Sequence, residues 1–445
     1  MRTTTAIPIR EIDFHPTSFC DADGRVFWWR GELYRGISAG YSPLCRRLFK
    51  EGVVRSLVQQ NFLIDTELTD YVLPGYALVL KHRPLKFVSY ANEWCPEMLR
   101  TAAQFTLDMM RSLAQHNLTL DVGTWDILFE GCEPRYVDFC SIAAAETYDR
   151  HSWNGVLDDF YSYFVNPLRL MGQGKGHMAR WLLADYEHRV IHSELAALMG
   201  QRIYGRRVAG WDGRIRRIWE AISRRDLCRL DLVAKMQRSL DQVSMPGSIA
   251  EALDPPKTEG NRQRPIYQTL SALRPVTVLD VGCGGGQYSR LAATLGAQVV
   301  AIDKDDRQVA RCYQMVKAQG LAVLPLVMDI RYPSAGQGVG KLAIAPATVR
   351  LSCELVMALD LLPLLVFEQH FTLAQAVEAL AAFSKRWLLV EFSRGVDAGF
   401  DEDKKPELSS GYTLDALLSL LGRHFQNVEM VPTQAGMSPL ILCER

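Results

Sequence analysis

The stretch Val278–Gln287, which reads VLDVGCGGGQ, decides the fold of the C-terminal part of this 445-residue chain. An apolar run typical of a buried strand ends here in three glycines at alternate positions, and a helical pattern follows over Gln287–Leu295. Because glycine has no Cβ, the backbone can approach a ligand closely, and the N-terminus of the next helix offers free N–H groups. The stretch therefore predicts a buried strand, a ligand-binding turn and a helix.

Further apolar runs follow, and helical patterns lie between most of them. The expected strands are Thr277–Gly282, Gln298–Asp303, Val323–Asp329, Leu355–Asp360 and Trp387–Phe392. Strands that are apolar throughout and separated by helices indicate a parallel sheet covered on both faces. The C-terminal part is therefore expected to be a doubly wound, Rossmann-like α/β domain.

Two details of the glycine turn argue against a dinucleotide site. The dinucleotide pattern G-x-G-x-x-G/A fails because Gln287 occupies its third position, and Asp280 stands two residues before the first glycine. The pattern D-x-G-x-G-x-G resembles motif I of class I S-adenosylmethionine-dependent methyltransferases. Over about the last 180 residues, this resemblance implies a seven-stranded sheet, with Leu440–Glu444 as its antiparallel seventh strand, and S-adenosyl-L-methionine as cofactor.

The resemblance also implies a role for the acid at each strand end. Asp280 would lie near the amino-acid part of the donor, Asp303 would accept the two ribose hydroxyls, and Asp329 would face the adenine amino group. A helix cap is the alternative role for such strand-terminal aspartates. The residues expected to bind the cofactor are Asp280, Gly282, Cys283, Gly284, Gly286, Asp303, Lys304, Asp329 and Ile330.

The methyl transfer that this resemblance implies is an in-line displacement. Much of its acceleration comes from the alignment of the acceptor with the methyl group. An oxygen acceptor would also benefit from a general base. The catalytic candidates near the predicted strand tips are Asp360, Glu391 and His370, and no metal ion is expected. The chemical identity of the acceptor atom stays open.

The N-terminal half has a different pattern. Strand-like segments are expected at Arg25–Trp29, Glu32–Ile37, Tyr76–Lys81 and Lys86–Ser89, with a helix at Ser42–Gln60 among them. Helical periodicity dominates from Pro96 to Leu240, apart from a hairpin near Ile127–Phe139. Strands followed by helices predict an α+β domain rich in helices.

Three acids in this half, Asp121, Asp126 and Asp138, are spaced as in kinases and aminoglycoside-phosphotransferase-like proteins, which the segment resembles. Such sites need a base and metal-holding oxygens that converge on one phosphoryl group. Here Asp126 replaces the asparagine, Cys140 replaces a glycine, no glycine-rich loop precedes, and Arg35 stands in a place comparable to that of the essential lysine. We expect a kinase-like fold that does not transfer phosphate. Whether the acids bind a metal ion or a nucleotide, or only brace a loop, stays open.

The whole chain is similar to a bacterial two-part methyltransferase family that includes nodulation host-specificity proteins. The similarity rests on Phe19–Asp21, Gly24–Phe27, Tyr34–Ile37, Ser89–Trp94 and Asp121–Ser141. It departs at Asp360–Pro363, where members of that family often carry a histidine pair. The expected domains are a kinase-like domain at 1–245 that binds the acceptor or a partner, a linker at 246–265, and a methyltransferase domain at 266–445.

Composition restricts the partners. The 50 basic and 50 acidic residues balance, which gives no electrostatic reason to bind nucleic acid or a membrane. Basic residues do gather over 202–229, but acids interrupt the run, so we interpret it as a solvated face. The N-terminus lacks an apolar signal segment and the ten cysteines show no paired spacing, so a cytoplasmic protein is expected.

A small-molecule, natural-product or glycan acceptor is the expected substrate. A bifunctional kinase-like phosphotransferase and a non-catalytic, cofactor-sensing module are the alternatives. The oligomeric state stays open.

Overall fold

The computed structural model describes residues 5–18, 21–185, 190, 191, 195, 229–245, 259–338, 344–395, 399, 411–434 and 437–445. They form two compact units. The first consists of residues 1–86, 90–128 and 134–248, and the second of 87–89, 129–133 and 249–445. The basic run over 202–228 and most of the predicted linker, 246–258, lie outside the described residues.

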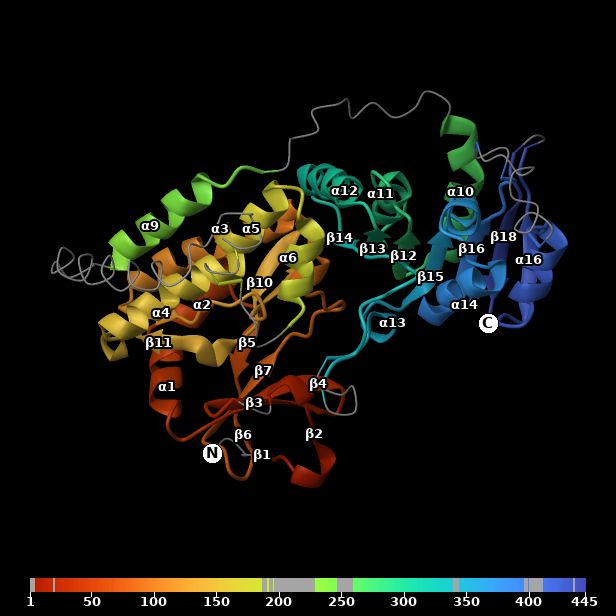
Figure 1. The fold of residues 1–445 in the computed structure, drawn as a ribbon. Helices are drawn as coiled ribbons and strands as arrows, with labels where there is room; N and C mark the ends of the chain where they lie inside the picture. The colour runs from red at the N-terminus through yellow and green to blue at the C-terminus, as the bar shows by residue number, and fades with distance from the viewer. Residues whose placement is uncertain are drawn as a thin grey trace. The chain divides into compact units, whose positions relative to one another are not determined.

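The second unit is built on one sheet, which has seven strands among the described residues (Figure 1). Its strands are β12 (Thr277–Val281), β13 (Gln298–Asp303), β14 (Val323–Val327), β15 (Cys353–Ala358), β16 (Ser384–Glu391), β17 (Asn427–Val431) and β18 (Leu440–Glu444). The order is β14-β13-β12-β15-β16-β18-β17. The first five strands in this order are mutually parallel, and β18 is antiparallel to both of its neighbours. The predicted Rossmann-like sheet with an antiparallel C-terminal strand is confirmed.

Helices of this unit cover the sheet. They are α10 (Glu259–Leu273), α11 (Gln287–Thr294), α12 (Asp306–Ala318), α13 (Ala347–Arg350), η8 (Leu364–Glu368), α14 (Leu373–Phe383) and α16 (Leu414–Leu421). Figure 1 shows α11 and α12 beside the β12–β14 end of the sheet. Side chains cap α12, α14 and α16, because Asp305, Thr372 and Thr413 each accept a backbone N–H of the first turn. The helix α10 begins inside the segment expected to be a linker.

The first unit begins with a five-stranded antiparallel sheet of order β2-β3-β4-β7-β5. These strands are β2 (Asp13–Phe14), β3 (Gly24–Trp29), β4 (Glu32–Ile37), β7 (Leu78–His82) and β5 (Thr66–Leu68), and β1 (Thr5–Ala6) pairs separately with β6 (Tyr71–Val72). Buried aromatic rings hold one face of this sheet together, with Phe27 stacked on Tyr34 and Trp29 packed against both Tyr34 and Tyr71.

Helices and two short antiparallel pairings follow the sheet. The helices are α1 (Ser42–Lys50), α2 (Val53–Gln59), α3 (Pro96–Ala114), α4 (Arg150–Phe160), η6 (Tyr161–Val165), α5 (Asn166–Gly172), α6 (Gly176–Leu183) and α9 (Arg229–Asp241), with short 3-10 turns η1 (Ile9–Glu11), η2 (Pro16–Ser18), η3 (Ala91–Glu93), η4 (Phe139–Ser141) and η5 (Ala145–Thr147). The pairings join β8 (Leu118–Leu120) to β11 (Ile142–Ala144) and β9 (Ile127–Glu130) to β10 (Glu133–Tyr136). An antiparallel sheet followed by helices and this hairpin is the α+β arrangement, rich in helices, that the sequence predicts.

Two local predictions need correction, and one strand was not predicted. The segment Lys86–Ser89 forms no strand, although its burial alternates as in one. The helix expected over Ser42–Gln60 is divided into α1 and α2, because Gly52 adopts φ +74°. The strand β17 was not predicted, since most of its residues are exposed and it lies at the edge of the sheet.

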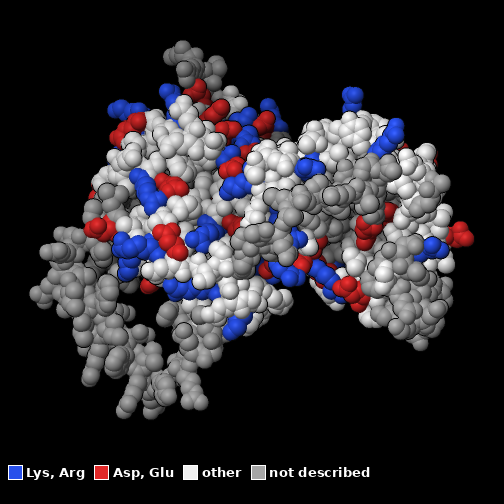
Figure 2. Space-filling model, turned by 90° about the horizontal axis from the view of Figure 1, so that it is seen from above, with Lys and Arg blue, Asp and Glu red and all other residues white. Residues whose placement is uncertain are grey.

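The charges of the surface agree with the neutral composition. On the face drawn in Figure 2, the described basic and acidic side chains are intermingled. Within the described part of the chain, no helix is both long and apolar enough to cross a bilayer.

Candidate functional site

The glycine turn after β12 is held against the neighbouring strand by backbone bonds. The amides of Gly282 and Cys283 both donate to the Ile302 carbonyl, at 2.8 and 3.1 Å, and the Gly286 amide closes the turn on the Cys283 carbonyl at 2.9 Å. Gly282, Gly284 and Gly286 have φ angles of +71°, +51° and +85°. A side chain at any of these three positions would strain the backbone, which explains the alternate glycines.

The three glycines differ in what surrounds them. A Cβ on Gly282 would lie 2.9 Å from the Leu361 side chain, and a Cβ on Gly286 would lie 2.4 Å from the Cys312 sulfur. A Cβ on Gly284 would meet nothing within 4 Å. Packing inside the unit therefore requires the outer glycines, whereas Gly284 borders open space in which a ligand can lie against the backbone.

The carboxylate of Asp303 is fixed at the end of β13. Its Oδ2 accepts the Gly284 amide at 3.0 Å, and its Oδ1 accepts the Asp305 amide at 2.9 Å. Burial raises the pKa of Asp303, and these two backbone bonds oppose the rise. Each oxygen keeps a further lone pair, so the carboxylate can still accept two hydroxyls.

The carboxylate of Asp280 is buried under the turn. Its side chain is 2% exposed, and Oδ2 accepts the hydroxyl of the fully buried Ser289 at 2.5 Å. Burial raises the pKa of Asp280 to about 6, although the Ser289 bonds act in the opposite direction. At neutral pH the Asp280 carboxylate is therefore charged although its burial disfavours the charged form. A cationic ligand group nearby would stabilise that charge.

The third acid, Asp329, has a partner that the sequence interpretation missed. The Arg331 guanidinium binds it with Nε 3.1 Å from Oδ1 and Nη2 2.7 Å from Oδ2. Burial acts to raise the pKa of Asp329, but the bonds from Arg331 outweigh it and hold that pKa below its ordinary value. Ile330 between them is buried, whereas Lys304 is exposed and pairs with Glu368 at 3.1 Å.

All of these positions lie at, or just after, the carboxyl ends of parallel strands of one sheet. Since β12, β13 and β14 are parallel and adjacent, the residues after their carboxyl ends meet at a single edge of the sheet. Ligands of open α/β sheets bind at this edge, near the point where the strand order reverses. Here the order reverses at β12, whose sequence neighbour β13 lies on one side and β15 on the other.

Two of the three catalytic candidates contact one another at the same edge. The amide of Asp360, just after β15, donates to the Glu391 carboxylate at the end of β16 at 3.3 Å. Asp360 is exposed and has a φ of +56°, whereas Glu391 is only 5% exposed. The third candidate, His370, is exposed and follows η8 with a φ of +56°.

An aromatic group next to Glu391 was not predicted from the sequence. The ring of Phe392 stacks on Tyr412 at a centroid distance of 4.9 Å, and Phe367 meets the same ring edge-on at 5.0 Å. The Tyr412 hydroxyl donates to the Ser393 carbonyl at 2.8 Å. These rings come from three distant parts of the sequence, so no local pattern indicates the group.

The three acids of the first unit that the sequence singled out, Asp121, Asp126 and Asp138, each lie against other residues of that unit. Asp121 accepts the Tyr148 hydroxyl at 2.6 Å, Asp138 binds Arg35 at 2.8 Å, and the carboxyl of Asp126 lies beside Gly123. Burial, and then the charges of Asp138 and Asp121, raise the pKa of Asp126 well above its ordinary value. Among the described residues, no group of three histidine, cysteine or acidic side chains is arranged to hold a metal ion.

The sheet order, the antiparallel last strand and the glycine turn between Asp280 and Asp303 are those of the class I methyltransferases. The second unit contains a methyltransferase domain. Residues 278–354 match the family model for a methyltransferase domain, a range that includes the glycine turn, Asp303 and Asp329.

Several solved structures are similar to part of the chain. WbdD has 16% identity, with 43% of this chain and 41% of that chain covered at a TM-score of 0.31. The magnesium protoporphyrin IX methyltransferase of Synechocystis PCC 6803 with bound S-adenosylhomocysteine has 19% identity, with coverage of 44% and 89% and a TM-score of 0.29. The N-methyltransferase NodS of Bradyrhizobium japonicum WM9 has 14% identity, with coverage of 42% and 96% and a TM-score of 0.30.

These likenesses identify no substrate. The match with WbdD spans about two fifths of that chain. No curated protein sequence matches this chain.

Proposed function

We propose that this chain transfers a methyl group from S-adenosylmethionine to a small-molecule, natural-product or glycan acceptor at the carboxyl edge of the sheet in the second unit. The observation that carries the proposal is the open space at Gly284, between the fixed carboxylate of Asp303 and the buried carboxylate of Asp280. A donor with a ribose diol and an ammonium group fits acids in these two places.

The donor would be held by four parts of the edge. Asp303 would accept the ribose hydroxyls, Asp280 would attract the ammonium group, and Gly284 would lie under the ligand. Asp329 and Ile330 would border the adenine, with Arg331 keeping the Asp329 carboxylate in one orientation. The cofactor supplies the activated methyl group when bound.

The acceptor would approach the tips of β15 and β16. Asp360 is the candidate general base, because its carboxylate is exposed beside the predicted reaction site. The buried Glu391 is better suited to hold the Asp360 backbone in its left-handed conformation than to exchange protons with an acceptor. Glu391 is therefore proposed as a positioning residue, and His370 as a second candidate base.

The kinase-like domain predicted at 1–245 would bind the acceptor or a partner, and the domain at 266–445 would carry out the chemistry. The balanced charge of the chain gives no reason to expect a nucleic-acid acceptor.

Transfer of label from S-[methyl-³H]adenosylmethionine tests the proposal. The full-length chain would be incubated with fractionated cell extract, and the small-molecule and polysaccharide fractions counted separately. Label is expected in one of these fractions with the unaltered chain and not with Gly284→Val.

The matched control is Gly296→Val, at a glycine that also has a positive φ and open space around it but precedes β13 at the opposite edge. Donor binding without label in any fraction would contradict catalysis and favour the cofactor-sensing alternative.

A further inference from the structure

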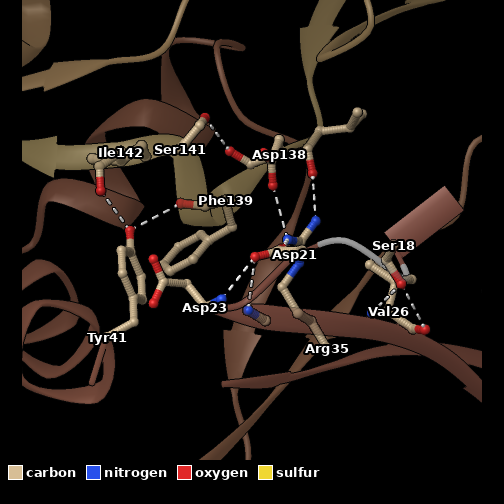
Figure 3. A network of polar contacts seen from close by, with 12 residues as sticks. Ser18, Asp21, Asp23, Val26, Arg35, Tyr41, Asp138, Phe139, Ser141 and Ile142 are labelled. Carbon is tan, nitrogen blue, oxygen red and sulfur yellow. Dashed lines mark hydrogen bonds and ion pairs between the residues drawn. The ribbon is translucent and has the colours of Figure 1, made fainter. Parts of the chain in front are cut away.

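The first unit contains a buried cation between two carboxylates. Arg35 lies in β4, its side chain is 7% exposed, and its Nη1 lies 3.0 Å from Asp21 Oδ2 and 2.8 Å from Asp138 Oδ1. Its Nη2 donates to the Val137 carbonyl at 3.3 Å. Figure 3 shows the guanidinium enclosed by Asp21 on one side and by the segment around Asp138 on the other.

Backbone bonds fix the acids that face this guanidinium. The Oδ1 of Asp21 accepts the amides of Asp23 and Gly24 at 2.9 and 3.0 Å, which leaves Oδ2 directed at Arg35. The Ser141 hydroxyl donates to the Asp138 carbonyl at 2.9 Å. The geometry is therefore set by the chain and does not depend on a mobile surface side chain.

The surroundings leave the arginine little freedom. A Cβ on Gly24 would lie 2.6 Å from the Cys140 sulfur and 3.2 Å from the Arg35 Cδ, so the stem of the arginine is packed against the β3 backbone. Burial would lower the pKa of Arg35, but Asp138 and Asp21 more than offset this and raise it. The guanidinium stays charged at every accessible pH.

We propose that Arg35 is the permanent counter-cation of this acidic cluster and occupies the place that a divalent metal ion would need between Asp21 and Asp138. A metal ion could bridge Asp21 Oδ2 and Asp138 Oδ1 only if the guanidinium left, and that would leave a buried charge without a partner. Phosphoryl transfer in kinase-like folds depends on metal ions that bridge the phosphates. The proposal therefore predicts that this unit is a scaffold closed by an ion pair, with no metal ion between Asp21 and Asp138 and no phosphate transfer.

The proposal predicts that removal of the arginine creates a cation site. Arg35→Ala should lower the melting temperature of the first unit by roughly 6 to 20 °C, from the penalty for breaking a buried pair in a unit of this size. Millimolar MnCl₂ or methylguanidinium chloride should restore more than half of that loss, whereas NaCl at equal ionic strength should not. The unaltered chain should show no shift with MnCl₂ and no heat of binding with MgCl₂ plus ATP.

The matched control is Arg83→Ala, because Arg83 pairs with Asp65 at 2.8 Å on the surface, where both side chains are at least 40% exposed. It should change the melting temperature by no more than about 4 °C, as expected for an exposed pair, and should gain no response to manganese. Arg35→Lys, which keeps a positive charge, should fold and should also gain no response. If Arg35→Ala does not fold, the responses of the unaltered chain and of Arg35→Lys to MnCl₂, and of the unaltered chain to MgCl₂ plus ATP, still test the proposal.

Binding of Mn²⁺ or of magnesium with ATP to the unaltered chain, lost in Asp138→Asn, would overturn the proposal. A folded Arg35→Ala that gains no cation response would also overturn it. Titration of each variant with S-adenosylhomocysteine separates this proposal from the proposed methyl transfer, because the donor site lies in the other unit and its affinity should not change.

Discussion

The substitution Asp280→Asn should make the methyltransferase unit more stable and the donor site weaker. Burial raises the pKa of Asp280 from an ordinary value of 3.8 to about 6, a difference of about 2 pKa units. At 1.36 kcal/mol per unit, the ionised carboxylate lowers the free energy of unfolding at neutral pH by up to about 3 kcal/mol. Asparagine carries no charge and keeps an oxygen that can accept the Ser289 hydroxyl.

We therefore expect Asp280→Asn to raise the free energy of unfolding at pH 7.5 by about 1 to 3 kcal/mol. The affinity for S-adenosylmethionine should fall by about 10- to 150-fold, the equivalent of one charged hydrogen bond. The pH dependence has a definite sign. Because the folded state holds the Asp280 proton more tightly than the unfolded state, the stability of the unaltered chain should fall as the pH rises from about 4 to about 6, and this part of the slope should vanish in the variant.

Urea unfolding of the full chain at several pH values measures the stability, and isothermal titration calorimetry measures the affinity. The matched control is Asp415→Asn, at an exposed acid in the first turn of α16 in the same unit. A variant that loses more than about 1 kcal/mol at pH 7.5 while the control does not would refute the burial argument. An unchanged donor affinity would refute the placement of Asp280 in the site.

Three further results are expected. Asp303→Ala should weaken donor binding in calorimetry by about 2–3 kcal/mol, since it removes a bidentate acceptor, and an affinity within threefold of the unaltered value would contradict that role. Gly284→Val should abolish donor binding while Gly296→Val retains it, and equal affinities would show that Gly284 does not border the ligand. Glu391→Ala should reduce kcat at least tenfold with donor affinity nearly unchanged, whereas Glu391→Gln, which keeps an acceptor for the Asp360 amide, should recover most of the rate; equal losses in both variants would contradict a positioning role.

The strand pattern could be predicted from the sequence because the buried strands of the parallel sheet consist mainly of apolar residues. The acids were found because each stands near the carboxyl end of such a strand: Asp280 is the last residue but one of β12, Asp303 ends β13 and Asp329 comes shortly after β14. The strand β17 was not predicted, because a strand exposed at the edge of a sheet need not show the continuous apolar pattern of a buried strand. The segment 86–89 was wrongly predicted to be a strand. Phe87 and Ser89 are buried in alternation, as in a strand, but the segment pairs with no strand that the structure describes.

The contacts around the acids could not be predicted, because they depend on the three-dimensional arrangement. Ser289 reaches Asp280 only because α11 packs directly over the turn, and the need for glycine at 286 comes from Cys312 on another helix. The glycines at 282 and 286 were assigned to the ligand from the sequence, whereas the structure gives each of them a packing neighbour. Arg331 stands two residues after its partner Asp329, in the segment after β14, where neither helix nor strand periodicity indicates which side chains meet.

The Arg35 ion pair joins residues 103 positions apart. The sequence indicated that an arginine stood in place of a lysine, but only the fold shows that this arginine lies between Asp21 and Asp138. The proposal that Arg35 takes the place of a metal ion therefore rests on contacts that no local sequence pattern indicates.

Calorimetric titration of the full-length chain with S-adenosylhomocysteine, and then separately with NAD and with ATP plus magnesium, shows which ligand the glycine turn binds. S-adenosylhomocysteine alone is expected to bind, with micromolar affinity. No binding of S-adenosylhomocysteine, together with binding of NAD or of ATP, would contradict the assignment of the glycine turn as a methyl-donor site.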